Sequence, residues 1–482
     1  MRNFILFFLL FTVSCIDIKA QIKVYHLQNL NLKAGDDFGS SVSINEEWIA
    51  VGARRFRNET GQVLIYKSSA NAWLLKQELV ASEVVEGDFF GSDLAMTDKY
   101  LVAGAPTDHW VSGLEGKVVV YELINGAWAE QSTLYPPSNF QASAYGYIVN
   151  SHKEKIVVGA PDQNWEGAVV VYGNEGGEWI ELQVISPESN NQRNFGGAID
   201  MNDEWLVIGA YNSIPDEATA LEILLYKWEN GQYVYKQSIL NERVAIPFQI
   251  PYWNMELSDN QLIVGNHRVN NGENITGGTK VYSLNGSTWV LDQTLSPSGF
   301  ELHELGRHVA LSERFAMFGA SNFPSSDFDE PHHVIFYETS NPDSWNPIGT
   351  FSYEGSSFLD WQAFNFDIGE RFATAGTGNS LNQHGDVYIY DLRSFITTSV
   401  NQLPLENIKL FPTITNSSIT IQADKVLKNI SIYNSSGNEV MNKLVNLNTL
   451  ELSLSLSRLI QGTYFVLVET ETGNLFKKII KL

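Results

Sequence analysis

The stretch KIVVGAPDQNWEGAVVVY, Lys155 to Tyr172, joins two apolar, β-branched runs through a polar segment. Such runs are typical of paired β-strands. In the polar segment, Asp162, Asn164 and Glu166 precede Gly167 at the alternate spacing of oxygen ligands in a calcium loop. The stretch is therefore either a metal site or one copy of a structural unit, and the rest of the chain decides between them.

The Gly-Ala element of this stretch recurs seven times along the chain. Its copies are AVGAR at Gly52, VAGAP at Gly104, VVGAP at Gly159, VIGAY at Gly209, IVGNH at Gly265, MFGAS at Gly319 and TAGTG at Gly376. They follow one another at 50 to 57 residues. A period of this length over seven copies indicates a repeat architecture.

Each copy has the pattern of four short strands. An aromatic or apolar residue followed by Gly opens five of the seven copies, at Phe38, Phe90, Tyr145, Phe195 and Leu305. The Gly-Ala strand, a strand such as GKVVVY and a last strand such as AWLLKQEL follow. Asn-Gly pairs at 125–126, 230–231 and 285–286 predict tight hairpins between the third and fourth strands.

Seven four-stranded units without helical periodicity predict an all-β fold, a seven-bladed β-propeller over residues 21–392. The segment Ile22 to Leu30 has the pattern of a fourth strand but precedes the first copy, and the seventh copy ends after its third strand. We therefore expect the N-terminal strand to complete the last blade beside Val387 to Tyr390. Closure of this kind removes exposed sheet edges.

The motif pair DDFGSSVSI and VGAP resembles the FG-GAP repeat of integrin α-subunit propellers and of many bacterial secreted proteins. The resemblance extends over about residues 34 to 392 and implies a fold more than a function. In calcium-binding members, an acidic loop joins the Phe-Gly strand to the Gly-Ala strand. Here tight turns such as INEEW at Ile44 to Trp48 take that place.

Two interpretations of the opening stretch remain. The segment from Asp162 to Gly167 lies in a different connection, between the second and third strands, and the AVVVY that follows offers no bidentate carboxylate. We favour a polar turn that ends in Gly. Calcium binding by Asp162, Asn164 and Glu166 is the weaker alternative, and no other cofactor is expected.

Residues 405–482 form a second predicted domain, a small C-terminal β-sandwich with alternating apolar residues such as Ile430, Ile432 and Val440. Its sequence resembles the C-terminal sorting domain of the type IX secretion system. The matching residues are Pro412, Gly437, Gly462, Tyr464, Lys478 and Lys481. The resemblance implies export by that machinery, removal of the domain, and release or attachment to surface polysaccharide. Residues 393–404 are the predicted linker.

The N-terminus and the composition place the protein outside the cell. Residues 1–20 have the basic start, apolar core and small final residue of a signal peptide, with cleavage after Ala20 favoured over a lipoprotein cut before Cys15. Cys15 is the only cysteine, so the mature chain has no disulfide. No later run predicts a transmembrane segment. The net charge of −24 argues against nucleic acid as a partner.

The long connections predict where a ligand would bind. Connections between the second and third strands, and between consecutive units, fall on one face of a propeller, while tight turns occupy the other. Long loops on a rigid scaffold commonly carry binding residues. The aromatic candidates are Phe56, Trp110, Trp165 and Phe328, although Trp110 and Trp165 are equally well explained as packing residues.

Two histidine motifs were weighed as metal or catalytic sites. HELGRH, His303 to His308, separates its histidines by five residues and lacks a helix, so it does not fit a zinc protease. His332 and His333 lie near Asp327, Asp329 and Glu330, but adjacent histidines on an extended segment point in opposite directions. We expect a solvated loop there and keep His332 as a ligand-binding candidate.

We expect a monomeric, secreted or cell-surface module without catalytic activity, which binds a glycan or a protein through its loop-rich face in recognition or adhesion. The alternative is an extracellular hydrolase or polysaccharide lyase that uses the central channel. That alternative predicts carboxylate, His, Arg or Tyr side chains from different blades near the axis. A spacer in a surface layer or in gliding machinery is the third hypothesis.

Overall fold

The computed structural model divides into two compact units, Ile22–Leu392 and the part that begins at Arg393. The described residues are 22–29, 31–69, 72–107, 116–138, 140, 144–161, 166–189, 192–212, 219–244, 255–266, 278–295, 305–306, 308–320, 332–339, 345–353, 364–378, 385–398, 408–411, 414–423, 426–434, 439–445, 449–470 and 474–482. Nearly all regular structure is β, as predicted.

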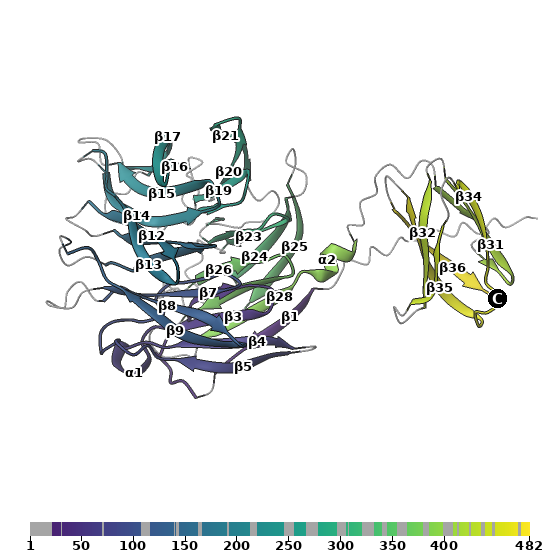
Figure 1. Cartoon of the computed structure of the whole chain (residues 1–482), viewed down its shortest axis with the longest axis horizontal. Coiled ribbons are helices and arrows are strands. Elements are labelled where there is room, and N and C mark those ends of the chain that lie inside the picture. Colours follow the sequence, from purple (N-terminus) through teal and green to yellow (C-terminus); the bar gives the residue numbers. More distant parts are fainter. Residues whose placement is uncertain are drawn as a thin grey trace, which may run out of the picture. The chain divides into compact units, whose positions relative to one another are not determined.

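Seven four-stranded antiparallel sheets form the first unit, one for each sequence repeat (Figure 1). Blades 1 to 3 are β2(Phe38–Ile44), β3(Trp48–Ala53), β4(Val63–Ser69), β5(Ala72–Leu79); β6(Leu94–Met96), β7(Tyr100–Ala105), β8(Lys117–Ile124), β9(Ala127–Leu134); and β10(Ile148–His152), β11(Lys155–Ala160), β12(Ala168–Glu175), β13(Glu178–Ile185). Blades 4 and 5 are β14(Gln192–Met201), β15(Trp205–Asn212), β16(Thr219–Glu229), β17(Gln232–Val244); and β18(Met255–Leu257), β19(Gln261–Asn266), β20(Gly278–Asn285), β21(Thr288–Leu295). Blades 6 and 7 are β22(Val309–Leu311), β23(Phe315–Ala320), β24(His332–Glu338), β25(Asn346–Tyr353); and β26(Phe364–Ile368), β27(Phe372–Thr377), β28(Asp386–Asp391) with β1(Lys23–Leu27).

The ring closes as the sequence predicted. β1 pairs with β28 from Lys23 opposite Asp391 to Leu27 opposite Val387, and Figure 1 shows the two strands side by side. The first strands of successive blades contact one another around the whole ring, and β26 of blade 7 contacts β2 of blade 1. The chain is therefore a closed seven-bladed propeller whose first strand completes its last blade.

The two glycines of the repeat form the contact between neighbouring blades. A Cβ atom on Gly52 of blade 1 would stand 2.2 Å from the carbonyl oxygen of Gly91 in blade 2. Gly376 of blade 7 approaches Gly39 of blade 1 in the same way, at 2.4 Å. Gly91 also has a φ of +82°, a conformation that residues with a side chain seldom adopt. The motif therefore contains glycine because the backbones of two neighbouring blades approach too closely for a side chain.

Apolar side chains fill the spaces between the blades. The cluster that joins blades 7 and 1 includes Phe372, Val387 and Ile389 together with Val42 and Ile49. A buried aliphatic side chain of this size contributes about 1.5–3 kcal/mol. Each sheet buries both faces against its neighbours, so the strands are hydrophobic in long runs and the ring is stable without disulfides.

A glutamine that recurs in the fourth strands of several blades forms hydrogen bonds to the next blade. Gln77 of β5 donates from Nε2 to the carbonyl oxygen of Trp128 at 2.9 Å and accepts at Oε1 from its main-chain N–H at 2.7 Å. Gln183 binds Tyr233 of the next blade in the same manner, and Gln237 binds Trp289. Each glutamine side chain thus bonds both the N–H and the carbonyl of one residue in the fourth strand of the next blade. A neighbouring strand in a sheet would make the same pair of bonds.

The second unit is a two-sheet sandwich after a short helix. α2(Arg393–Thr398) occupies the first part of the predicted linker. The sheets hold β29(Ile408–Phe411), β31(Ser418–Ala423) and β34(Glu451–Ser455), and β30(Ile414–Thr415), β36(Asn474–Lys481), β35(Gly462–Thr470), β32(Leu427–Asn434) and β33(Glu439–Leu444). Ile430 and Ile432 are buried as predicted. Val440 is 40% exposed, because β33 lies at the sheet edge.

Candidate functional site

The two faces of the propeller differ in how the strands are joined. On one face, short turns connect the first strand to the second and the third to the fourth. Asn125 and Gly126, with φ of 51° and 79°, make one such turn, as predicted. On the other face lie the connections that the sequence predicted to be long, such as residues 54–62 and 80–93. We call this second face the loop-rich face.

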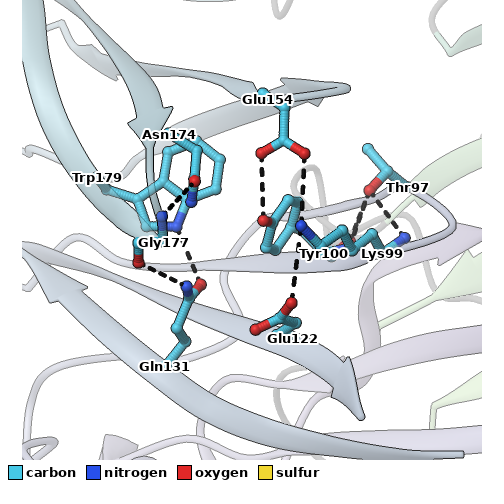
Figure 2. A network of polar contacts seen from close by, with 9 residues as sticks. All are labelled: Thr97, Lys99, Tyr100, Glu122, Gln131, Glu154, Asn174, Gly177 and Trp179. Carbon is cyan, nitrogen blue, oxygen red and sulfur yellow. Dashed lines mark hydrogen bonds and ion pairs between the residues drawn. The ribbon is translucent and has the colours of Figure 1, made fainter.

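Ion pairs between neighbouring blades occupy the tight-turn face. Lys99 of blade 2 lies 3.4 Å from the Glu154 carboxylate of blade 3, whose other oxygen accepts from the Tyr100 hydroxyl at 3.2 Å (Figure 2). Lys153 of blade 3 binds Asp203 of blade 4 at 2.5 Å. Exposed pairs of this kind contribute about 0–1 kcal/mol each. They join blade 2 to blade 3 and blade 3 to blade 4.

On the loop-rich face, the structure describes Phe56 among the aromatic candidates. Phe56 opens the short helix α1(Phe56–Glu59), is half-buried and packs against the cluster between blades 7 and 1. The Arg57 guanidinium lies over its ring at 4.9 Å. Arg57, Asn58 and Glu59 all have φ between 50° and 66°, so the loop holds three consecutive residues in a left-handed conformation. Phe56 is thus both a packing residue and part of an accessible cationic loop.

The other candidates are placed only in part. Trp110, Trp165 and Phe328 lie outside the described residues. His332 begins β24, where it pairs with Tyr353, and His333 follows it in the same strand. His332 and His333 therefore belong to the sheet and not to the expected solvated loop, and Asp327, Asp329 and Glu330 lie outside the described residues.

The end of the opening stretch is structural. Gly167 has a φ of +98°, and a Cβ there would stand 2.2 Å from the carbonyl oxygen of Phe195 in blade 4. The Glu166 carbonyl accepts from the Phe195 N–H at 2.9 Å, and its carboxylate lies 3.8 Å from Arg193. Asp162 and Asn164 lie outside the described residues. Among the residues that are described, no group of three or more His, Cys, Asp or Glu side chains is arranged to hold a metal ion.

Four acidic side chains from different blades converge at the axis of the propeller. They are Asp93 of blade 2, Asp200 of blade 4, Glu256 of blade 5 and Asp367 of blade 7, and the charges of the other three act on Glu256. All four lie on or next to the innermost strands. Asp200 is buried and the other three are half-buried. We call them the axial carboxylates.

Three of the axial carboxylates bond the innermost strands of neighbouring blades. Asp93 accepts from the Val149 N–H at 2.7 Å, and Asp367 from the Ile44 N–H at 2.8 Å. Asp200 accepts from the Leu257 N–H at 2.5 Å and from the Asn150 amide at 2.7 Å. Glu256 makes no hydrogen bond to any residue that the structure describes. Its carboxyl group is therefore the one of the four that does not bond the strand of a neighbouring blade within the described residues.

The surroundings favour the protonated form of these groups. Burial raises the pKa of Asp93 to about 7, even though main-chain N–H groups and Asn365 donate to it. Burial, with the charge of Asp200, Asp367 and Asp93, raises the pKa of Glu256 well above its usual range. The pKa values of Asp200 and Asp367 are also raised by burial. Within the described part of the chain, no Lys or Arg pairs with any of the four.

The axial carboxylates were not among the sites predicted from the sequence. The sequence does contain a pattern at this place. The fifth residue after the aromatic residue of the aromatic-Gly motif is polar in three copies of the repeat, which have Ser43, Asn150 and Asp200 there. Polar residues at one alternate position of an innermost strand indicate the side that faces the axis. The pattern does not predict that these side chains meet, because the four residues are 50 or more positions apart in the sequence.

The sorting-domain residues are found on the sandwich. Gly462 begins β35, and Tyr464 is buried with its hydroxyl donating to the Ile460 carbonyl at 2.9 Å. Lys478 pairs with Phe465 in the ladder between β35 and β36. Lys481 is buried and donates to the Leu482 carbonyl at 3.0 Å. Pro412 and Gly437 lie outside the described residues.

Two segments of the chain match known families. Residues 73–121 match the FG-GAP repeat, and residues 409–482 match the secretion system C-terminal sorting domain. Both matches confirm the resemblances predicted from sequence. The first match lies within the propeller unit and the second within the C-terminal unit.

Curated relatives of the propeller are integrin subunits. Integrin alpha-11 of Homo sapiens is 27% identical over 206 residues, which is 38% of this chain and 17% of that protein. Integrin alpha-11 of Mus musculus is 27% identical over 180 residues, 32% of this chain and 15% of that protein. The chain thus spans less than a fifth of the length of these relatives.

Solved propellers resemble the chain at low identity. The β-propeller domain of the Trilobed protease from Pyrococcus furiosus aligns with a TM-score of 0.42 and 10% identity, covering 75% of this chain and 95% of that one. A putative 6-phosphogluconolactonase from Bacteroides uniformis aligns with a TM-score of 0.41 and 9% identity, covering 65% and 88%. Neither similarity bears on what this chain binds.

The location of the protein follows from its C-terminal domain. Across the described residues, no helix has the length and apolar character that crossing a membrane requires. A C-terminal sorting domain directs export by the type IX secretion machinery. The chain is therefore an FG-GAP-type seven-bladed β-propeller with a type IX C-terminal sorting domain, exported to the cell surface or beyond it.

Proposed function

We propose that this protein is a non-catalytic recognition module that binds a glycan or a protein through the loop-rich face of its propeller. The observation that carries the proposal is the difference between the two faces. Tight turns and ion pairs between blades occupy one face, whereas the other face holds the connections in which Phe56 and Arg57 lie. Variable loops on a rigid ring are suited to recognition.

A binding screen with the full chain tests this function. Glycan arrays and pull-downs with surface proteins should yield a specific ligand, and Phe56→Ala, Trp110→Ala and Trp165→Ala should weaken it. Lys153→Ala on the tight-turn face is the matched control and should leave binding unchanged. Binding that is lost in Lys153→Ala but retained in all three aromatic variants would place the binding site on the tight-turn face and contradict the proposal.

The axial carboxylates support a second candidate, an extracellular hydrolase or polysaccharide lyase. Glycoside cleavage commonly uses one protonated and one ionised carboxyl group. The Glu256 carboxyl, with a strongly raised pKa, is suited to donate a proton, and Asp93, whose pKa is about 7, is partly ionised at neutral pH.

An assay for polysaccharide breakdown separates the two functions. Reducing ends measured after incubation with soluble polysaccharides should rise only if the chain is an enzyme, and Glu256→Gln should then abolish the rise. Asp98→Asn, an exposed change outside the axial carboxylates, is the control. If Glu256→Gln keeps full turnover, the axial carboxylates are not the catalytic groups.

A further inference from the structure

A polar groove lies on the outer wall of blade 2. It is a shallow groove open to solvent, with a volume of about 530 Å³, between β9 and the connection that enters this blade, and its lining residues are Ser82, Glu83, Glu130, Gln131, Ser132, Thr133 and Tyr135. The far end of β9 pairs with the start of β8, where Leu134 lies opposite Val118. The groove therefore extends from the middle of the blade toward the rim of the loop-rich face.

The groove combines a flat aromatic surface with hydrogen-bonding groups. The Tyr135 side chain is 47% exposed, although it is a large partly apolar group. Around it stand two carboxylates, three hydroxyl-bearing residues and one amide. An aromatic ring beside several polar groups is well suited to a sugar, whose ring has apolar C–H faces and a rim of hydroxyls.

Hydrogen bonds hold these groups in place before any ligand arrives. The Tyr135 hydroxyl donates to the Glu83 carboxylate, and the Tyr135 carbonyl accepts from the Tyr172 hydroxyl at 3.2 Å. Glu130 accepts from the Ser82 N–H at 2.9 Å and from its hydroxyl at 2.5 Å. Preorganised side chains lose less entropy when a ligand binds.

Charge restricts the kind of glycan. Glu83 and Glu130 are both exposed, and no Lys or Arg is among the lining residues. Lys117 approaches the Glu83 carbonyl at 3.0 Å but is paired with Asp88 at 2.7 Å. A carboxylate oxygen has two lone pairs, so both acids keep acceptor capacity for sugar hydroxyls. Uronic acids and sulfated sugars would meet like charge, here and on the rest of a chain of net charge −24.

From these observations we propose that the groove between β9 and residues 82–83 binds an uncharged glycan chain. The Tyr135 ring stacks against a sugar ring, and the Glu83 and Glu130 carboxylates accept hydrogen bonds from sugar hydroxyls. The proposal rests on the recognition function above and gives it a ligand class. The groove is a second site, on the outer wall of blade 2, and it does not include Phe56. The two sites can therefore be tested separately.

Titration of the full chain tests the groove. The probes are cello-, laminari-, manno- and xylohexaose as uncharged ligands, with polygalacturonate and heparin oligosaccharides as charged ones. At least one uncharged probe should bind, and Tyr135→Ala should weaken it about tenfold through loss of the stacked ring. Tyr135→Phe, which keeps the ring, should bind nearly as well as the native chain, and Glu130→Gln should weaken binding.

Two further variants control for folding and position. Tyr235→Ala removes an aromatic ring that is 38% exposed on the fourth strand of blade 4, and it should leave binding unchanged. Ser132→Trp should fill the groove and block the ligand without touching the bond between Tyr135 and Glu83. It decides the matter should Tyr135→Ala fail to fold.

The outcomes distinguish this site from the wider recognition function. Binding that survives Tyr135→Ala and Ser132→Trp but disappears with Phe56→Ala overturns the groove and leaves the loop-rich face as the binding site. Preference for the charged probes, or binding to none of the uncharged ones, also overturns the groove. Failure to bind any glycan and any protein overturns both.

Discussion

The carbonyl oxygen of Gly146 in blade 3 lies 2.1 Å from the point where a Cβ on Gly104 of blade 2 would stand. No side-chain carbon fits at that distance, so the two backbones meet directly. Gly159 and Gly196 repeat the relationship at 2.2 Å between blades 3 and 4. Gly104 is thus a glycine because of the contact between neighbouring sheets, whereas Gly146 also has a φ of +86° that favours glycine.

Gly104→Ala should destabilise the propeller. Its Cβ would overlap the Gly146 carbonyl, and the blades would have to separate, at a cost of about 1–3 kcal/mol or more. Gly369→Ala is the control, because the nearest described atom to its Cβ is a Glu46 carboxylate oxygen at 3.4 Å. Denaturant unfolding measures both. Equal losses of stability in the two variants would contradict a specific contact between blades.

Gln77→Ala should also lower the unfolding free energy. The variant leaves the N–H and carbonyl of Trp128 without the amide that binds them, a loss of about 1–3 kcal/mol. Lys76→Ala, at the exposed neighbouring position of β5, should change stability by less than about 0.5 kcal/mol. The same denaturant series compares them, and a larger effect of Lys76→Ala would disprove the role of Gln77.

Deletion of residues 22–27 should open the ring. β28 would lose its partner and expose a sheet edge, together with the contacts that Leu27 makes in the cluster between blades 7 and 1. Calorimetry should show a fall in Tm of about 5–10 °C for the propeller transition, and size-exclusion chromatography should show aggregates. Deletion of residues 409–482, in the other unit, is the control. A propeller transition unchanged by the first deletion would rule out a stabilising closure.

The stability of the propeller should fall as the pH rises through neutrality. The pKa of Asp93 is about 7 in the folded chain, above the ordinary value of 3.8. A raised pKa means that the folded state holds its proton more tightly than the unfolded state. The stabilisation is therefore complete below pH 3.8 and is lost as the pH rises through about 7. The raised pKa values of Glu256, Asp200 and Asp367 act in the same direction.

Asp93→Asn tests this pH dependence. Unfolding free energies measured between pH 5 and 8 should fall less steeply in the variant than in the native chain, because one proton-linked group is gone. Asp98→Asn, on the exposed turn of the same blade, should keep the native slope. A native chain that becomes more stable over this interval would contradict the assignment of Asp93.

The sequence by itself determined the architecture. The Gly-Ala and aromatic-Gly motifs, their period and the displaced strand at Ile22 define seven blades and their closure, because five of the seven contacts between blades bring the same two glycines together. The sorting domain was equally evident, since its motifs run through one continuous segment. The alternation of apolar residues that includes Val440 did not reveal that its strand lies at a sheet edge, because periodicity carries no information about strand order.

Only the tertiary structure brought the candidate sites together. Asp93, Asp200, Glu256 and Asp367 are separated by 50 or more residues, and nothing in the local sequence requires them to share an axis. The groove beside Tyr135 combines β9 of blade 2 with the connection between blades 1 and 2, and its negative charge depends on the ion pair of the nearby Lys117 with Asp88. Local patterns specify strands and turns, whereas a site assembled from several blades exists only once the ring has closed.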